Sequence, residues 1–83
     1  MELETGFGKV LRKLREEREL TQEALAFEAG ISRNYVSLME LGQKSPSLRT
    51  LQALSNALGV SLTVLMQRLE SELAQGAKAA RRR

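Results

Sequence analysis

The first regular pattern in the chain is a stripe of apolar residues with helical spacing. Large side chains recur at intervals of three or four residues on this stripe: Phe7, Val10, Leu11 and Leu14. Such spacing places the residues on one face of a helix, and the positions between them are mostly charged. We therefore expect a helix from about Gly6 to Arg18, with a short lead-in at residues 1–5.

Two shorter helices are predicted next, joined by a turn at Gly30. Thr21 and Ser32 are suitable N-caps for these helices, because a hydroxyl oxygen can accept an amide hydrogen of the first turn. An apolar residue stands just before each cap, and a second apolar residue follows the first at a distance of five positions. Such a pair forms a hydrophobic staple. Gly30 can adopt the left-handed conformation that ends a helix. The segment from Gln22 to Leu41 therefore reads as a helix-turn-helix, whose second helix typically enters the DNA major groove.

Two more helices are predicted after this motif. Ser47 would cap a fourth helix that ends at Gly59, and Ser61 would cap a fifth. Leucines with helical spacing mark the expected core side of the fourth helix: Leu48, Leu51, Leu54 and Leu58. Because no segment alternates with a period of two, we expect an all-α domain at residues 6–75 and a basic tail at residues 76–83.

The central segment resembles the lambda-repressor-like (Xre) helix-turn-helix DNA-binding domains. The resemblance rests on apolar and small positions: Leu25, Ala26, Gly30, Ile31, Val36 and Met39. It includes the flanking runs Leu20-Thr21-Gln22-Glu23 and Glu40-Leu41-Gly42-Gln43-Lys44-Ser45-Pro46, and it covers about residues 7–66. It implies a five-helix DNA-binding domain, here with an extended fifth helix. It also implies an ion pair between Arg15 and Glu40 that ties the first helix to the third.

Residues near the start of the third helix are the candidates for reading base edges. They are Ser32, Arg33, Asn34, Ser37 and Leu38. Arginine can pair bidentately with guanine, and asparagine with adenine. Leu38 departs from the polar residue that is frequent at this position in the family. It would contact a thymine methyl group or read nothing.

A second set of residues is predicted to hold the DNA backbone: Gln22, Tyr35, Gln43, Lys44, Ser45 and Arg49. Gln22 begins a helix, where the amides and the helix dipole favour an anion, and the resemblance implies the same role. The loop residues Gln43, Lys44 and Ser45 would hold another phosphate, with Arg49 nearby. Tyr35 would contact the backbone through its hydroxyl or only cover the edge of the helix.

The predicted fifth helix is longer than the fold requires. Leu62, Leu65 and Met66 would complete the core, whereas Leu69 and Leu73 prolong the stripe. These two leucines could fold back on the first helix or pack on a second copy of the chain. We favour the second copy, because soluble monomers rarely expose a large apolar ridge and one recognition helix reads few base pairs. Leu65, Leu69 and Leu73 are therefore assigned to a homodimer interface.

Composition narrows the possible functions. The 83 residues include no cysteine and no histidine, which argues against disulfides, the usual zinc sites and most acid–base or nucleophilic catalysis. No apolar run approaches the roughly 20 residues of a membrane span, and the acidic N-terminus lacks the order of a signal peptide. We expect a cytoplasmic protein that is not an enzyme and has no cofactor, metal or membrane partner.

The net charge of +3 depends on the C-terminal end. Without Lys78 and Arg81–Arg83, nine basic residues remain against ten acidic ones. We expect residues 76–83 to be flexible and to attract DNA phosphates without regard to base sequence.

The favoured hypothesis is a sequence-specific transcriptional regulator, a repressor or autoregulator, that binds a near-palindromic operator in double-stranded DNA as a homodimer. The alternative is a protein-interaction module of the antitoxin or anti-repressor type. Its partner would bind the fifth helix or the acidic face of the second helix, at Glu23 and Glu28. RNA is disfavoured, because three aromatic residues are too few for a base-stacking platform.

Overall fold

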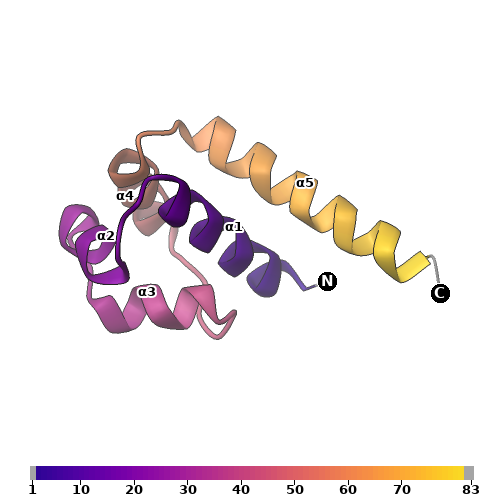
Figure 1. Cartoon of the computed structure of the whole chain (residues 1–83), viewed down its shortest axis with the longest axis horizontal. Coiled ribbons are helices and arrows are strands. Elements are labelled where there is room, and N and C mark those ends of the chain that lie inside the picture. Colours follow the sequence, from indigo (N-terminus) through magenta and orange to yellow (C-terminus); the bar gives the residue numbers. More distant parts are fainter. Residues whose placement is uncertain (1, 82–83) are drawn as a thin grey trace.

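The computed structural model describes the backbone of residues 2–81 and the side chains of residues 2–77. Residues 2–81 form five α-helices and no strand, as the sequence predicts (Figure 1). The helices are α1 (Leu3–Glu17), α2 (Gln22–Ala29), α3 (Arg33–Glu40), α4 (Leu48–Leu58) and α5 (Leu62–Arg81).

The predicted caps determine where the four later helices begin. Thr21 Oγ1 accepts from the amide of Ala24 at 3.0 Å. The hydroxyls of Ser32, Ser47 and Ser61 accept from the third residue of their helices in the same way, at 3.0–3.1 Å. The glycines after α2 and α4 both have φ near 70°, the left-handed conformation that lets a helix end there. The starts of α2 to α5 are therefore confirmed.

The two outer ends of the fold differ from the prediction. The expected lead-in at residues 1–5 is wrong from Leu3 onward, because α1 begins there with Glu4 in its first turn, where the helix dipole favours a carboxylate. Helix α5 does not end at residue 75 but continues to Arg81. Alanines and other good helix formers follow Gly76, and one glycine costs only about 1 kcal/mol. The predicted phosphate-binding side chains, Lys78 and Arg81–Arg83, lie outside the described side chains.

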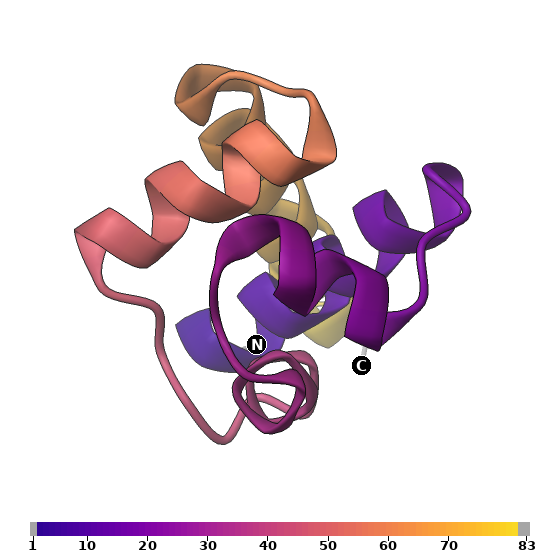
Figure 2. The same cartoon turned by 90° about the vertical axis from the view of Figure 1, so that its left-hand side faces the viewer.

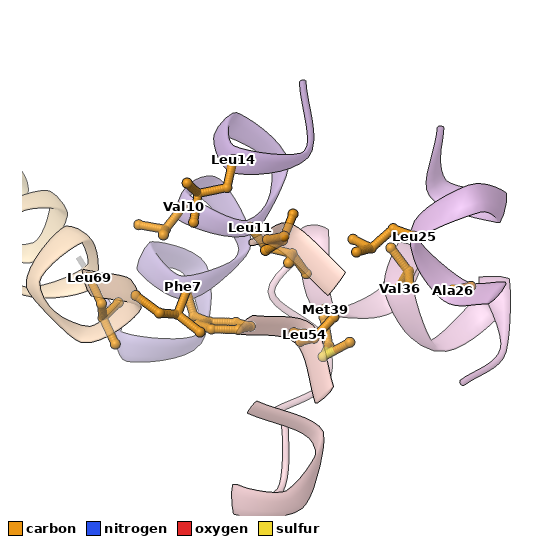
Figure 3. Packing of buried hydrophobic residues seen from close by; sticks show 12 residues of the cluster. Phe7, Val10, Leu11, Leu14, Leu25, Ala26, Val36, Met39, Leu54 and Leu69 are labelled. Carbon is orange, nitrogen blue, oxygen red and sulfur yellow. The ribbon is translucent and has the colours of Figure 1, made fainter. Parts of the chain in front are cut away.

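A single apolar core holds the helices together. Figure 1 shows α5 running alongside α1, with α2, α3 and α4 gathered toward the other end of the molecule. Every residue of the predicted α1 stripe is buried, and in Figure 3 these side chains lie between Leu69 of α5 and the side chains of α2, α3 and α4. On α4, Leu54 and Leu58 are buried as expected, but Leu48 is 77% exposed. Its assignment to the core is wrong, because α4 enters the fold from the loop with its first residue turned outward.

The assignment of Leu65 and Leu69 to a homodimer ridge is also wrong. Leu65 is fully buried and Leu69 is 9% exposed within one chain, and Leu73 is partly buried against the same core. The physical reason is that α5 packs along α1 with the opposite chain direction. Two ion pairs flank this contact: Arg68–Glu17 at 2.7 Å and Lys13–Glu72 at 2.8 Å. The stripe on α5 therefore folds back on α1.

Gly8 allows α1 and α3 to approach each other closely, which the sequence analysis did not anticipate. A Cβ atom at Gly8 would lie 2.5 Å from the carbonyl oxygen of Met39 and 2.7 Å from that of Glu40. Both oxygens belong to the last turn of α3. The absence of a side chain at Gly8 therefore sets how close the end of α3 can sit to α1.

Candidate nucleic-acid interface

Helix α3 presents a polar face to solvent because its apolar residues are fully used by the core. Val36 and Met39 are both completely buried. The residues assigned to base reading point away from them: Ser32, Arg33 and Asn34 are exposed, and Ser37 and Leu38 are half-buried. In Figures 1 and 2, α3 lies at the lower edge of the molecule, with α1 and α2 packed against its inner side and the α3–α4 loop at its end. The face is therefore accessible to a large partner.

The structure brings base-reading and phosphate-binding candidates together in one shallow hollow. Its lining comes from α3 and the α3–α4 loop: Ser32, Asn34, Tyr35, Leu38, Lys44 and Ser45. Arg33 is exposed at the start of the same helix but does not line the hollow. Arg49 faces a different hollow, which it shares with Leu48, Gln52 and Leu62 of α4 and α5. Neither arginine therefore lines the main hollow.

The predicted pair of Arg15 and Glu40 is present and has a third member. Arg15 donates from Nε to Glu40 Oε2 at 2.6 Å and from Nη2 to Oε1 at 3.1 Å. Its Nη1 donates to the carbonyl of Leu20 at 2.8 Å. The hydrogen bond with Glu40 raises the pKa of Arg15. Gln22 Nε2 also donates to Glu40 Oε1, at 3.0 Å, so one carboxylate connects α1, the start of α2 and the end of α3.

This network orients Gln22 without using all of its donors. An amide nitrogen carries two hydrogens, and one of them is directed to Glu40. Thr21 satisfies the amide of Ala24, whereas the first amides of any helix lack partners within that helix. The second hydrogen of Gln22 and these amides together suit an anion at the start of α2.

Tyr35 and Ser45 connect α3 to the loop that follows it. The hydroxyl of Tyr35 donates to the carbonyl oxygen of Ser45 at 3.1 Å. The hydroxyl of Ser45 lies 3.4 Å from Glu4 Oε2 in the first turn of α1, a long and correspondingly weak contact. The participation of Glu4 was missed by the sequence analysis, because nothing in the pattern around Glu4 indicates that it lies beside a loop 41 residues away.

Positive charge is unevenly neutralised across the molecule. Several basic residues of α1 and α5 are held in exposed ion pairs: Arg12–Glu16, Lys13–Glu72 and Arg68–Glu17. Arg18 donates to the carbonyl of Leu58 at 2.7 Å. By contrast, Arg33, Lys44 and Arg49 form no ion pair with any residue of the described part, and on α1 the same holds for Lys9. Uncompensated cationic groups therefore lie on α3, the following loop and the start of α4, where a polyanion would benefit from them.

The described residues hold neither a candidate membrane span nor a candidate metal site. None of the helices there is long and apolar enough to cross a membrane. No group of three or more cysteine, histidine or acidic side chains in that part of the chain could hold a metal ion.

Comparison with known proteins adds a family and several relatives. A family model described as helix-turn-helix matches residues 11–65. The control protein C.MunI of a Mycoplasma species is 36% identical over 72 residues, which are 86% of this chain and 97% of that protein. The immunity repressor protein of Bacillus phage phi105 is 39% identical over 59 residues. Those residues are 71% of this chain but only 41% of the phage repressor, so the chain spans less than half of that relative.

A solved structure shows what a similar protein binds. The restriction-modification controller protein C.Esp1396I has been determined as a tetramer in complex with its natural 35-base-pair operator. It is 28% identical to this chain with a TM-score of 0.82, and the match covers 89% of this chain and 97% of that one.

Proposed function

We propose that this chain, which belongs to the helix-turn-helix family, is a sequence-specific DNA-binding regulator of transcription. The observation that supports this most directly is the shared hollow, in which base-reading candidates of α3 stand beside Lys44 and Ser45. Base contacts and phosphate contacts must be made at the same time for a protein to read sequence in register. Candidates for both kinds of contact line this one hollow, which supports the proposal.

In this proposal α3 lies in the major groove, which is wide enough to admit a helix. Arg33 and Asn34, exposed in the first turn, pair with guanine and adenine edges, and Ser32 and Ser37 add shorter polar contacts. Leu38 lines the same hollow as Asn34, which supports contact with a thymine methyl group over an idle role. Val36 and Met39 contribute by fixing the orientation of the helix from beneath.

Two phosphate contacts flank the inserted helix. Gln22 and the first amides of α2 would hold one phosphate, with the Gln22 side chain oriented by Glu40. Lys44 and Ser45 of the loop would hold another, with Gln43 exposed beside them. Arg49 would contribute at longer range, since it lies outside the main hollow.

The regulator would act as a homodimer on a near-palindromic operator. The oligomeric operator complex of C.Esp1396I supports this assembly. Since Leu65 and Leu69 are buried within one chain, a second copy must use another face of α5. The face that remains includes half-buried Leu62 and Met66, and Leu62 shares a hollow with Leu48, which is 77% exposed. Two copies joined there through a twofold axis would bury these side chains in both chains.

Occupancy of a promoter is then the output of the domain, so we propose repression or autoregulation rather than catalysis. We also propose a cytoplasmic location, because the proposed ligand is DNA and the relatives include bacterial control proteins.

A second candidate function is supported by one observation. Phe27 on α2 is 87% exposed, and it shares a hollow with Glu23 and Glu28. An exposed aromatic residue with an acidic border is suited to binding another protein, and the acidic groups would repel DNA. A protein-interaction role at this face is compatible with DNA binding through α3.

In vitro selection from a random duplex pool at physiological salt tests the main proposal. We expect an enriched sequence with two symmetric half-sites, about one helical turn or ~34 Å apart. Footprinting on that sequence should protect both half-sites. The absence of enrichment, together with equal weak binding of all duplexes, would contradict sequence-specific regulation and favour the protein-interaction role.

A further inference from the structure

The loop between α3 and α4 carries phosphate-binding candidates, but few hydrogen bonds hold its centre. At its start, the amide of Gln43 donates to the carbonyl of Leu38 at 2.9 Å. At its end, Ser47 caps α4. Between these points the hydrogen bonds of the described residues meet at Ser45, whose carbonyl accepts from Tyr35 and whose hydroxyl lies near Glu4.

Tyr35 is itself held firmly at both ends. Its backbone amide donates to the Ser32 hydroxyl at 3.0 Å, which makes it part of the capped first turn of α3. Its ring is half-buried and packs against the apolar core. A ring fixed in this way determines where its hydroxyl lies, so the bond to Ser45 transmits the position of α3 to the centre of the loop.

Hydrogen-bond capacity argues against a direct phosphate contact by the hydroxyl of Tyr35. A phenol has one hydrogen to donate, and here the acceptor is the carbonyl oxygen of Ser45. A phosphodiester oxygen can only accept. The hydroxyl therefore cannot hold a phosphate while this bond is intact, and a DNA contact would have to break it.

We propose that Tyr35 is a positioning residue that orders the α3–α4 loop, so that Lys44 and Ser45 meet a phosphate while α3 reads the bases. This inference rests on the proposed DNA-binding function. Both loop residues border the same hollow as Tyr35 and Asn34, so the register of the loop relative to α3 matters for simultaneous contact. A loop that is ordered before binding does not lose that conformational freedom when DNA binds. Tyr35 thus supports affinity without reading a base.

The test uses Tyr35→Phe, which keeps the packed ring and removes only the hydroxyl. In the free protein, ¹⁵N relaxation should show the order parameters of Lys44 and Ser45 falling from about 0.85 toward 0.6, with those of α3 unchanged. Affinity for the selected operator and for a random duplex should fall by the same factor, about tenfold, which corresponds to ordering roughly one residue. The preferred base sequence should not change.

Two double variants separate positioning from direct contact. If Tyr35 acts through the loop, Tyr35→Phe should add little to the loss caused by Lys44→Ala. It should add fully to Arg33→Ala, the matched control, because Arg33 lies outside the hollow. Lys44→Ala should lower the salt slope by ~0.9, and adding Tyr35→Phe to that variant should lower it no further.

Several results would overturn the inference. These are unchanged order parameters at Lys44 and Ser45, a shift in preferred bases, or full additivity with Lys44→Ala. If the unmutated protein selects no sequence, the proposed function fails. The relaxation measurement still decides whether Tyr35 orders the loop, so the two failures are distinguishable.

Discussion

Glu40 shows how much of the fold depends on one side chain. Its side chain is 5% exposed, and its carboxylate accepts two hydrogen bonds from Arg15 and a third from Gln22. Arg15 has one further acceptor, the carbonyl of Leu20. Loss of Arg15 would therefore leave a nearly buried carboxylate with only Gln22 as partner, whereas loss of Glu40 would leave Arg15 partly satisfied.

We expect Arg15→Ala to destabilise the protein by about 3 kcal/mol, because it leaves that charge largely uncompensated. Glu40→Ala should cost less, and the double variant should cost less than the sum of the two singles. Urea unfolding of the three variants measures these free energies. Additive losses would show that the pair contributes no coupling energy.

Arg33 is the residue whose replacement should change base preference. Arg33→Ala should weaken binding to the preferred site by about 1–3 kcal/mol and relax selection at one position, because a bidentate contact to guanine would be lost. Binding to random duplex should change less. Lys44→Ala is the control, since loss of a phosphate contact should weaken binding to every sequence alike. Equal losses on both duplexes for Arg33→Ala would place Arg33 among the phosphate contacts.

At the scale of elements, α5 is held on α1 by apolar contacts with ion pairs at the edges. Hydrogen bonding to Arg68 lowers the pKa of Glu17, and this carboxylate is exposed. A lowered pKa means that the stabilising contribution of the pair is present above the ordinary glutamate pKa near 4.3 and is lost as the pH falls below it. Because such surface pairs contribute little, Leu69 should matter more than either charge.

Leu69→Ala should destabilise the isolated chain by about 2–5 kcal/mol, because it leaves a cavity between α5 and Phe7 of α1. Leu73→Ala should cost clearly less, since Leu73 is only partly buried. Chemical denaturation at a concentration where the protein is monomeric provides the comparison. If Leu69→Ala left the stability of the monomer unchanged and altered only its association, α5 would have to leave α1 in solution.

At the scale of the whole molecule, the face with Leu48 is the proposed contact between copies. Leu48→Glu should give a folded monomer, because the side chain is 77% exposed and an acidic residue suits the first turn of a helix. Phe27→Glu is the matched control: Phe27 is even more exposed, but it lies on α2, away from this face. Sedimentation should show a dimer for the parent and for Phe27→Glu. A parent that is monomeric at high micromolar concentration would refute the homodimer.

The C-terminal end carries four basic residues that we expect to attract DNA phosphates. Replacing Lys78 and Arg81–Arg83 by glutamine keeps the length and removes four positive charges from the chain. Binding to all duplexes should weaken alike, and the salt slope should fall by ~0.9 for each phosphate contact that is lost. An unchanged slope would mean that these residues do not approach the DNA.

The helix boundaries illustrate what local sequence can decide. Thr21, Ser32, Ser47 and Ser61 each bond an amide three residues later, and Gly30 and Gly59 end their helices through their own φ angles. These interactions span at most one helical turn, so they can be recognised from neighbouring residues alone. The helix-turn-helix follows from these interactions, and the α1 stripe follows from the spacing of its apolar residues. The ion pair of Arg15 with Glu40 was implied by the family resemblance.

The remaining features depend on segments that are distant in the chain, and only the tertiary structure decided them. The sequence favours a surface ridge for Leu69, whereas in the structure α5 lies along α1 and Leu69 belongs to the core. Gly8 is restricted by carbonyls of α3, and Ser45 is reached from both Tyr35 and Glu4. Apolar periodicity indicates which face of a helix is buried but not which neighbour covers it, because that choice depends on how all five helices fill one core.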